Sequence, residues 1–395
     1  MVLRNRLSTI AAAAALLVAC QNVALNQAIP VSQPVAPQCS APAVKTTNGT
    51  VCGVSVSGGK IHAYLGIPYA QSTAGLNRWS PPLPVAKSKA TLKATSFGPV
   101  CPQAADKSPF PQSEDCLSLN VWTPQKKSGS GRPVMVFIHG GAFVFGSSAN
   151  PLYNGSALAA RGVVVVTLNY RLGALGFLAG IDGLTGNYGF LDQQLALKWV
   201  RDNIAAFGGD PGKVTIFGES AGAMSVGLHL QSPVSRRMFR AAIMESNPFG
   251  MPYKSMSEAG RFGGHFRSAV GCRSGGLDCL KRVPFATLVQ HQKTFWIEIE
   301  SLLSGFSGQL VWAPVVDGET VPAQANQNQI SQPVIVGTNR DEGVIFANFG
   351  KGGFMATEQL YRIKYSAAIA LLFSRTMAAK VRSHPSYRPV SGDNT

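Results

Sequence analysis

One serine in the sequence has a glycine two residues away on each side, a pattern that suits nucleophilic chemistry. Ser220 is the centre of "GESAG", which follows the apolar run "KVTIF" and precedes a run of small residues. A nucleophile on a tight strand-to-helix turn needs such glycines, because side chains at those positions would not fit. The other interpretation is an ordinary strand-to-helix turn. The placement between an apolar run and a small-residue run favours a nucleophile at Ser220.

A second stretch, "FIHGGAF", could supply hydrogen-bond donors to that serine's reaction. It closes an earlier apolar run, and its glycines leave backbone N–H groups free to face a developing oxyanion. We expect the donors to be the amides of Gly141 and Ala142, together with that of Ala221. His139 in the same stretch is a candidate base, but its position fits a structural role in holding the loop.

An acidic residue follows a later apolar run, in "VIVGTNRDEG". Glu342 comes after Ser220 in the chain, which is the order of nucleophile and acid in serine hydrolases of this strand–turn–helix type. A carboxylate there would orient an imidazole and stabilise its charged form. We interpret the neighbouring Asp341 as a surface acid.

The elements that must position these residues are predicted by short apolar runs bounded by turn signals. The runs are "PVMVFIH", "GVVVVTLNY", "KVTIFG", "AAIMES" and "PVIVGTN", while "VCGVSV" and "KIHAYLGIPYA" are earlier hairpin candidates. Uninterrupted apolar runs are typical of strands buried on both faces, as in a parallel sheet. Such sheets place their chemistry beyond the carboxyl ends of the strands, where the candidate residues fall.

Helical patterns lie between the strands, most clearly over residues 191–207. Helical spacing puts Leu195, Trp199 and Ile204 on one face, with Arg201, Asp202 and Asn203 outside it. Strands alternating with helices predict an α/β sheet covered on both sides.

Several motifs together resemble the type-B carboxylesterase family, which includes cholinesterases and bacterial para-nitrobenzyl esterases. "FGGDPGKVTIFGESAG" is similar to the family's nucleophile signature over its full length. "EDCLSLNVWTP" resembles its second signature, with Ser118 where an aromatic residue or threonine is more usual. The likeness also includes "NYRLGALGFL" and "APVVDGETVP", and it runs from about residue 43 to the end.

The resemblance implies an α/β-hydrolase fold, with a mostly parallel central sheet and helices on both faces. It also implies a serine carboxylic ester hydrolase that needs no metal or cofactor, with a small-molecule ester as its partner. In this interpretation Ser220 is the nucleophile and Glu342 the triad acid, with Gly141, Ala142 and Ala221 as the oxyanion hole. The alternative is a non-catalytic cholinesterase-like protein used in binding or adhesion.

The family's catalytic histidine is missing from its expected place. It lies roughly a hundred residues after the acid, whereas this sequence continues only to Thr395. The one histidine after Glu342 is His384, in a segment that resembles the turn before a later family helix. The sequence therefore predicts a domain over residues 43–395 whose last part is absent. Since loss of the histidine costs about 10⁶ in turnover in a comparable triad, we expect this chain to be nearly inactive.

The amino terminus has the pattern of an export signal. Basic residues precede an apolar run from Ile10 to Ala19 that is too short to span a bilayer. "LVAC" resembles a bacterial lipobox, which predicts cleavage before Cys20 and lipid attachment to it. The other interpretation is an ordinary signal cleaved a few residues later. We expect a signal peptide at 1–19, a lipid-anchored or flexible linker at 20–42, and a periplasmic, outer-membrane or secreted location.

The remaining cysteines suit that compartment. An even set in an exported protein favours disulfides, and proximity in the sequence pairs Cys39 with Cys52, Cys101 with Cys116, and Cys272 with Cys279. Spacing alone does not fix the connectivity. The family resemblance implies the second and third pairs, and the first would be an addition.

The composition argues against nucleic-acid binding despite a net charge of +16. The basic residues are scattered along the chain, whereas nucleic-acid binding usually needs a clustered stripe. The sequence therefore predicts membrane contact only through an N-terminal lipid, and it says nothing of oligomeric state.

The substrate pocket is the least defined part of the prediction. Between the nucleophile and the acid, the aromatic and apolar residues Phe249, Met251, Tyr253, Phe295 and Trp296 are candidate walls, each of which could instead be core. Apolar walls would favour small aryl or short-chain esters.

Overall fold

The computed structural model describes residues 39–103, 110–126, 129–249, 251–292, 310–324, 330–340 and 342. Several residues named above lie outside this range, and what was predicted for them stays a prediction: Cys20, Phe295, Trp296, Asp341 and His384.

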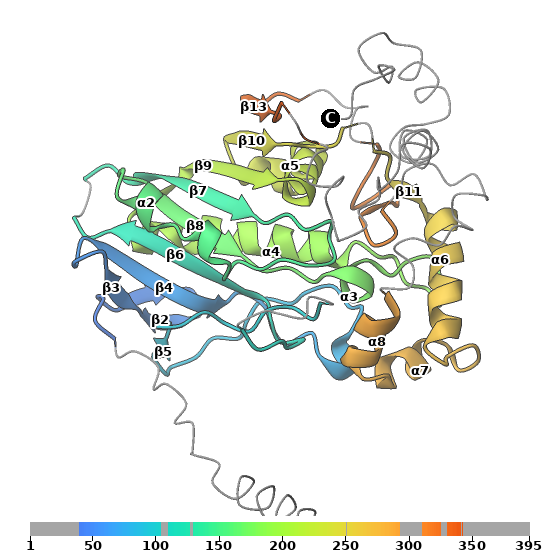
Figure 1. The fold of residues 1–395 in the computed structure, drawn as a ribbon. Coiled ribbons are helices and arrows are strands. Elements are labelled where there is room, and N and C mark those ends of the chain that lie inside the picture. The colour runs from blue at the N-terminus through green and yellow to red at the C-terminus, as the bar shows by residue number, and fades with distance from the viewer. Residues whose placement is uncertain are drawn as a thin grey trace, which may run out of the picture. The chain divides into compact units, whose positions relative to one another are not determined.

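A mixed sheet of eight strands forms the centre of the described part of the chain (Figure 1). Its order is β13-β10-β9-β7-β8-β6-β4-β3, and the first five of these strands run parallel while the last three pair antiparallel. The five apolar runs after residue 131 form the five parallel strands, as predicted. The strands are β3 (Val54–Val56), β4 (Ile61–Pro68), β6 (Ser118–Pro124), β7 (Arg132–Ile138), β8 (Val164–Leu168), β9 (Gly209–Glu219), β10 (Ala241–Glu245) and β13 (Val334–Gly337).

Both faces of the sheet are covered by helices, which explains the uninterrupted apolar run of β8. Every residue of that strand is buried. Val164 and Val166 belong to the main core with α4 (Tyr188–Asn203) and α5 (Ala221–Gln231). Val165 points to the other face, where it packs with Trp122 and with Ala159 of α2 (Ser156–Ala159). Alternate side chains of one strand therefore serve two cores.

The helix predicted over residues 191–207 begins earlier, at Tyr188, and passes at Ile204 into the short 3₁₀ helix η3 (Ile204–Phe207). Trp199 and Ile204 are buried, whereas the prediction that Asn203 lies outside the core face is wrong. Asn203 is buried because its side chain is satisfied on both sides. It donates to the carbonyl of Trp199 (3.0 Å) and accepts from the amide of Thr47 (2.7 Å), which fastens the first strand to the end of the helix.

The remaining elements surround this sheet, and none of the described helices is long and apolar enough to cross a membrane. Figure 1 shows α6 to α8 on the side toward which β7 and β9 point. The elements are α3 (Gly173–Phe177), α6 (Met256–Ala269), α7 (Gly276–Arg282), α8 (Phe285–Gln292), β1 (Val44–Thr46), β2 (Gly49–Cys52), β5 (Leu92–Lys93), β11 (Lys254–Ser255), β12 (Val315–Val316), η1 (Gly75–Asn77), η2 (Pro151–Tyr153) and η4 (Ser235–Arg237).

Candidate active site

Ser220 occupies a strained turn between β9 and α5. Its backbone has φ 55° and ψ −120°, a conformation that non-glycine residues rarely adopt. Two backbone hydrogen bonds hold it there: its amide donates to the carbonyl of Glu245 (2.9 Å), and its carbonyl accepts from the amide of Met224 (2.9 Å). The side chain is half-buried, and because Ser220 directly follows β9 it lies at the carboxyl edge of the sheet.

The two glycines of the motif are required by the neighbouring backbone. A Cβ on Gly218 would come within 2.6 Å of the backbone of Gly222 and 2.7 Å of the Ile138 carbonyl oxygen. A Cβ on Gly222 would lie only 2.0 Å from the same oxygen. The end of β7 therefore fits directly against the turn, which leaves no room for side chains and confirms the reason given for the glycines.

The loop after β7 presents free amides next to Ser220. A Cβ on Gly140 would lie 3.2 Å from the Ser220 Cβ, so the loop touches the nucleophile. Gly141 has φ 107° and Ala142 φ 51°, a twist that turns successive N–H groups to one side. Within the described residues, the amides of Gly141, Ala142 and Ala221 have no hydrogen-bond acceptor. The predicted oxyanion-hole donors are thus unpaired, as such a site requires.

His139 holds this loop rather than facing the nucleophile. Its ring is buried and stacks on Tyr170 with 4.5 Å between ring centroids. Nδ1 lies 2.9 Å from the Gly140 carbonyl oxygen, and because that oxygen only accepts, Nδ1 carries the proton. The Tyr170 hydroxyl donates to the His139 carbonyl (2.9 Å). Burial lowers the pKa of His139 to about 4, so the ring is neutral at pH 7.

Glu342 follows β13 and is held as a carboxylate by residues that the sequence did not single out. The hydroxyl of Ser246 and the amide of Asn339 (2.7 Å) donate to it and lower its pKa, the hydroxyl most strongly. Ser246 follows β10, and its own amide donates to the Gly337 carbonyl (2.8 Å). Ser246 and Asn339 follow the ends of the neighbouring parallel strands β10 and β13. Their contact with Glu342 can therefore be recognised only once the order of the strands is known.

Three carboxyl groups gather around the turn of Ser220. Burial raises the pKa of Glu219, and the negative charges of Glu245 and Glu342 raise it further. Glu342 follows β13, which runs parallel to β10 and β9, so it lies at the same carboxyl edge of the sheet as Ser220. The structure thus brings the predicted acid to the same edge as the predicted nucleophile and oxyanion donors.

In the part of the chain that the structure describes, no histidine nitrogen is hydrogen-bonded to Ser220. His139 is engaged as above, and His229 is buried in α5 between Gln193 (3.1 Å) and Ser235 (2.9 Å). Of the candidate pocket walls, Tyr253 is core, with its hydroxyl donating to the Met224 carbonyl (3.3 Å), and Phe249 is 47% exposed.

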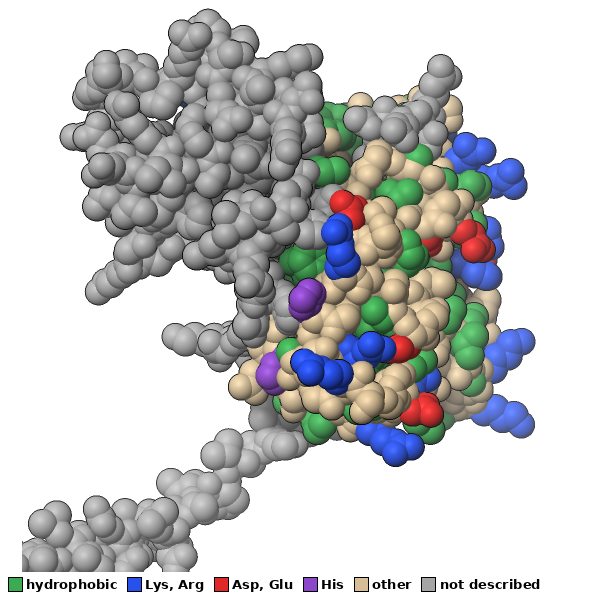
Figure 2. Space-filling model, turned by 90° about the vertical axis from the view of Figure 1, so that its right-hand side faces the viewer, with side chains coloured by type: hydrophobic (Ala, Val, Ile, Leu, Met, Phe, Trp, Pro, Cys, Tyr) green, Lys and Arg blue, Asp and Glu red, His purple; other side chains and the backbone are tan. Residues whose placement is uncertain are grey.

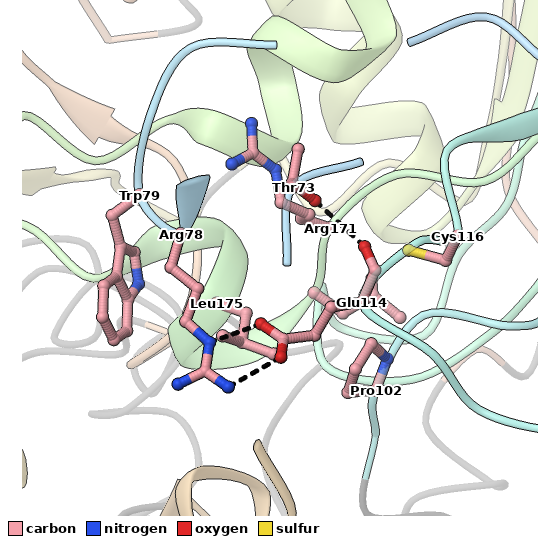
Figure 3. Close-up of a pocket in the computed structure, with 9 residues that line it drawn as sticks. Thr73, Arg78, Trp79, Pro102, Glu114, Cys116, Arg171 and Leu175 are labelled. Atoms are coloured by element: carbon pink, nitrogen blue, oxygen red, sulfur yellow. Dashed lines mark hydrogen bonds and ion pairs between the residues drawn. The ribbon is translucent and has the colours of Figure 1, made fainter. Parts of the chain in front are cut away.

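All three predicted disulfides are formed: Cys39–Cys52, Cys101–Cys116 and Cys272–Cys279. The second lies beside a small cavity that Cys116 helps to line and that contains none of the predicted catalytic or oxyanion-hole residues (Figure 3). There Arg78 forms two hydrogen bonds to Glu114 (2.5 and 2.6 Å), and Arg78 also donates to the Val283 carbonyl. The ion pair is largely shielded from solvent, so each of the two charges has its partner inside the protein.

The comparisons with known proteins agree with this geometry. The model of the carboxylesterase family matches residues 40–384. The para-nitrobenzyl esterase of Bacillus subtilis (strain 168) is 42% identical over 320 residues, which are 77% of this chain and 63% of that protein. The fumonisin B1 esterase of Sphingopyxis macrogoltabida is 39% identical over 339 residues, which are 80% of this chain and 59% of that protein. The chain thus spans about 60% of the length of these curated relatives.

Solved structures give the same result for the fold. A PNB esterase superimposes with a TM-score of 0.75 at 37% identity, covering 87% of this chain and 71% of that one. A thermophilic PNB esterase superimposes with a TM-score of 0.75 at 38% identity, and it covers the same shares of the two chains. The α/β-hydrolase fold is confirmed, and the chain belongs to the carboxylesterase family.

Proposed function

We propose that the protein is a carboxylic ester hydrolase that forms an acyl intermediate on Ser220. The observation that carries the proposal is the meeting of a strained, half-buried Ser220 with three unpaired backbone amides. Family membership and two relatives named as esterases support it.

Each group has a task in the proposed reaction. The Ser220 hydroxyl oxygen attacks the ester carbonyl carbon as its proton passes to a histidine, and the carbonyl oxygen becomes an oxyanion. The amides of Gly141, Ala142 and Ala221 hold that charge. The alcohol leaves with the proton, and water then releases the acid by the same steps. Glu342, whose pKa the Ser246 hydroxyl lowers further, would stabilise the histidine's positive charge. A histidine in that role is expected after Glu342 in chain order.

The side chains beside the oxyanion loop support a choice of substrate class. Phe145 is 42% exposed, and its ring lies 3.0 Å from where a Cβ on Gly141 would be. An aromatic ring next to an oxyanion donor favours a small ester with an apolar or aryl group. Rates that rise toward long acyl chains across a p-nitrophenyl ester series would contradict this choice.

Export as a lipoprotein belongs to the same proposal. It is supported by the basic start, short apolar run and "LVAC" of the sequence, and by three disulfides, which form in oxidising compartments. Palmitate labelling that depends on Cys20 would test the lipid attachment.

The alternative of a non-catalytic adhesion protein has no observation in its favour. A binding module needs neither a strained serine nor unpaired amides beside it, and maintaining both costs stability. The named relatives are all esterases.

The proposal is tested by Ser220→Ala in two measurements. An aryl phosphonate should form a covalent adduct on Ser220 of the folded chain, detected by peptide mass spectrometry, and none after heat denaturation. Hydrolysis of p-nitrophenyl acetate by the chain, at whatever rate, should fall in Ser220→Ala to the level without protein. A Ser220 labelled no more than the other serines of the folded chain would refute the proposal, whereas equal and low rates for both proteins would follow from the low turnover expected without a catalytic histidine. A turnover above about 1 s⁻¹ would instead overturn the low activity expected from the sequence.

A further inference from the structure

The fold gathers basic residues that are scattered along the sequence. At the amino ends of the parallel strands, Arg132 donates to the carbonyl of Lys126 (2.5 Å) and to that of Gly162 (3.1 Å), the residue after Arg161. The amide of the residue before Lys126 donates to the carbonyl of Lys60 (2.9 Å). Four basic residues from four separate stretches thus lie side by side at one edge of the sheet.

The same edge continues across β9 and β10. Arg132 pairs with the start of β9, where Lys213 forms an ion pair with Asp210 (3.0 Å). The amide of Arg240 donates to the Val214 carbonyl (2.8 Å), next to Lys213. Asp210 therefore pairs with Lys213 and leaves the other basic residues of this edge unchanged. We call this set the basic edge; its members are Lys60, Lys126, Arg132, Arg161, Lys213 and Arg240, all exposed except the half-buried Arg132.

Acidic residues lie at the other end of the described strands. The opposite, carboxyl edge carries Glu219, Glu245 and Glu342 around the nucleophile. On the face shown in Figure 2, basic side chains lie among uncharged and acidic ones. The three carboxyl groups around the nucleophile thus lie at the opposite ends of the parallel strands from the basic edge.

We propose that the basic edge binds the anionic headgroups of a phospholipid membrane. The edge crosses the strands from the β3–β4 turn to β10, and at about 4.8 Å per strand it is about 30 Å wide. A broad row of amines and guanidinium groups on strand ends suits a flat anionic surface, which attracts each cation near it. Only one of the six cations, Lys60, belongs to a two-stranded ribbon, in the turn of the β3–β4 hairpin, so the row as a whole does not enter a nucleic-acid groove.

The chain before the domain favours the same partner. Thirty-eight residues precede Cys39. If Cys20 is lipidated as proposed above, the residues between it and Cys39 reach at most about 60 Å, so the domain stays close to a membrane. Weak charge attraction is then sufficient for docking, because the second contact is intramolecular. Docking by the basic edge leaves Ser220, at the other ends of the strands, facing the aqueous side.

The test compares two triple variants of the full chain, each with Cys20→Ser so that no lipid is attached. The edge variant carries Lys60→Gln, Lys126→Gln and Arg161→Gln. The control variant removes the same charge from α7 and its surroundings with Arg273→Gln, Lys281→Gln and Arg282→Gln. Binding is measured by co-sedimentation with vesicles of equal parts phosphatidylglycerol and phosphatidylcholine, and with phosphatidylcholine alone.

We expect the parent chain to bind the anionic vesicles, with an affinity that falls as salt is added. Each cation near an anionic membrane surface contributes about 1 kcal/mol, so the edge variant, which lacks three of them, should lose on the order of 100-fold in affinity. The control variant should lose much less, because its three cations do not face the membrane. The segment before Cys39 is the same in all the proteins, so its own contribution to vesicle binding does not affect the comparison. Circular dichroism and melting curves must show all variants folded.

Equal losses in both variants would mean that only net charge matters, and an unchanged edge variant would mean that the edge is not used. Tighter binding of a DNA duplex than of vesicles, lost in the edge variant, would assign the edge to nucleic acid instead. Each of these results overturns the proposal. None of these measurements depends on ester hydrolysis, so failure of this proposal and failure of the proposed function can be distinguished.

Discussion

At the turn that carries Ser220, single atoms of the neighbouring strand decide which residues are allowed. The Ile138 carbonyl oxygen approaches both motif glycines. Close packing of strand ends therefore explains why a sequence pattern of two glycines can report on three-dimensional structure. It also keeps the nucleophile next to the loop of Gly141 and Ala142.

Gly222→Ala should destabilise the protein although alanine is the better helix former. Its Cβ would lie 2.0 Å from the Ile138 carbonyl oxygen, and such overpacking costs about 1–3 kcal/mol. Gly227 is in the same helix, but a Cβ there meets its nearest neighbour, the Asn247 amide nitrogen, at 3.4 Å. Gly227→Ala should therefore be neutral or stabilise by up to about 1 kcal/mol. Urea unfolding of both variants checks this, and equal effects would contradict it.

Ser246→Ala should raise the pKa of Glu342. The Ser246 hydroxyl is the strongest of the hydrogen-bond donors that favour the ionised form of this carboxyl group. The measurement is a carbon-detected NMR titration of glutamate side chains. Ser257→Ala, an exposed position of α6, is the control and should leave the Glu342 titration unchanged. A Glu342 pKa that does not move in Ser246→Ala would show that the hydroxyl does not bind the carboxylate.

At the scale of elements, the short pair β11–β12 contains a buried lysine. Lys254 is 1% exposed, and its ammonium donates to the Leu310 carbonyl. Burial lowers its pKa to about 7, although the carboxylate of Glu258 works in the other direction. The strand pair therefore holds a group whose charge is unfavourable in the folded state.

This lysine should make stability increase with pH. Between pH 7 and 10.5 the unfolded chain binds the lysine proton more tightly than the folded chain, so the free energy of unfolding rises with pH, by at most about 1.4 kcal/mol per unit. Lys254→Met should remove this slope between pH 7 and 9, while Lys60→Met, at an exposed position, should keep it. Urea unfolding at a series of pH values measures both slopes, and parallel slopes in all three proteins would disprove the assignment.

The disulfides should stabilise their elements unequally. The Cys101–Cys116 bridge closes 15 residues and the Cys272–Cys279 bridge 7, which correspond to about 3 and about 2 kcal/mol in the loop-entropy description. Both sulfurs of the first bridge are also buried, whereas Cys279 is partly exposed. Replacing the first pair by alanine should lower the melting temperature more than replacing the second. The reverse order would show that strain or residual unfolded structure dominates.

Across the whole molecule, sequence patterns predicted what depends on neighbours along the chain. The five parallel strands, the turn of Ser220 and the loop of Gly141 follow from local runs and glycines. Partners that meet only through strand order were not predictable: Ser246 reaches Glu342 because β10 and β13 are adjacent. Asn203 was misplaced for the same reason, since its acceptor role depends on a strand more than 150 residues earlier. The basic edge is the largest example.

The opposition of charge between the two ends of the strands has a practical consequence for a biocatalyst. A bead that carries sulfonate groups would attract the protein by its basic edge, without any engineered tag. Since Ser220 lies at the opposite ends of the strands, the immobilised molecules would share one orientation and present their reactive serine to the flowing substrate.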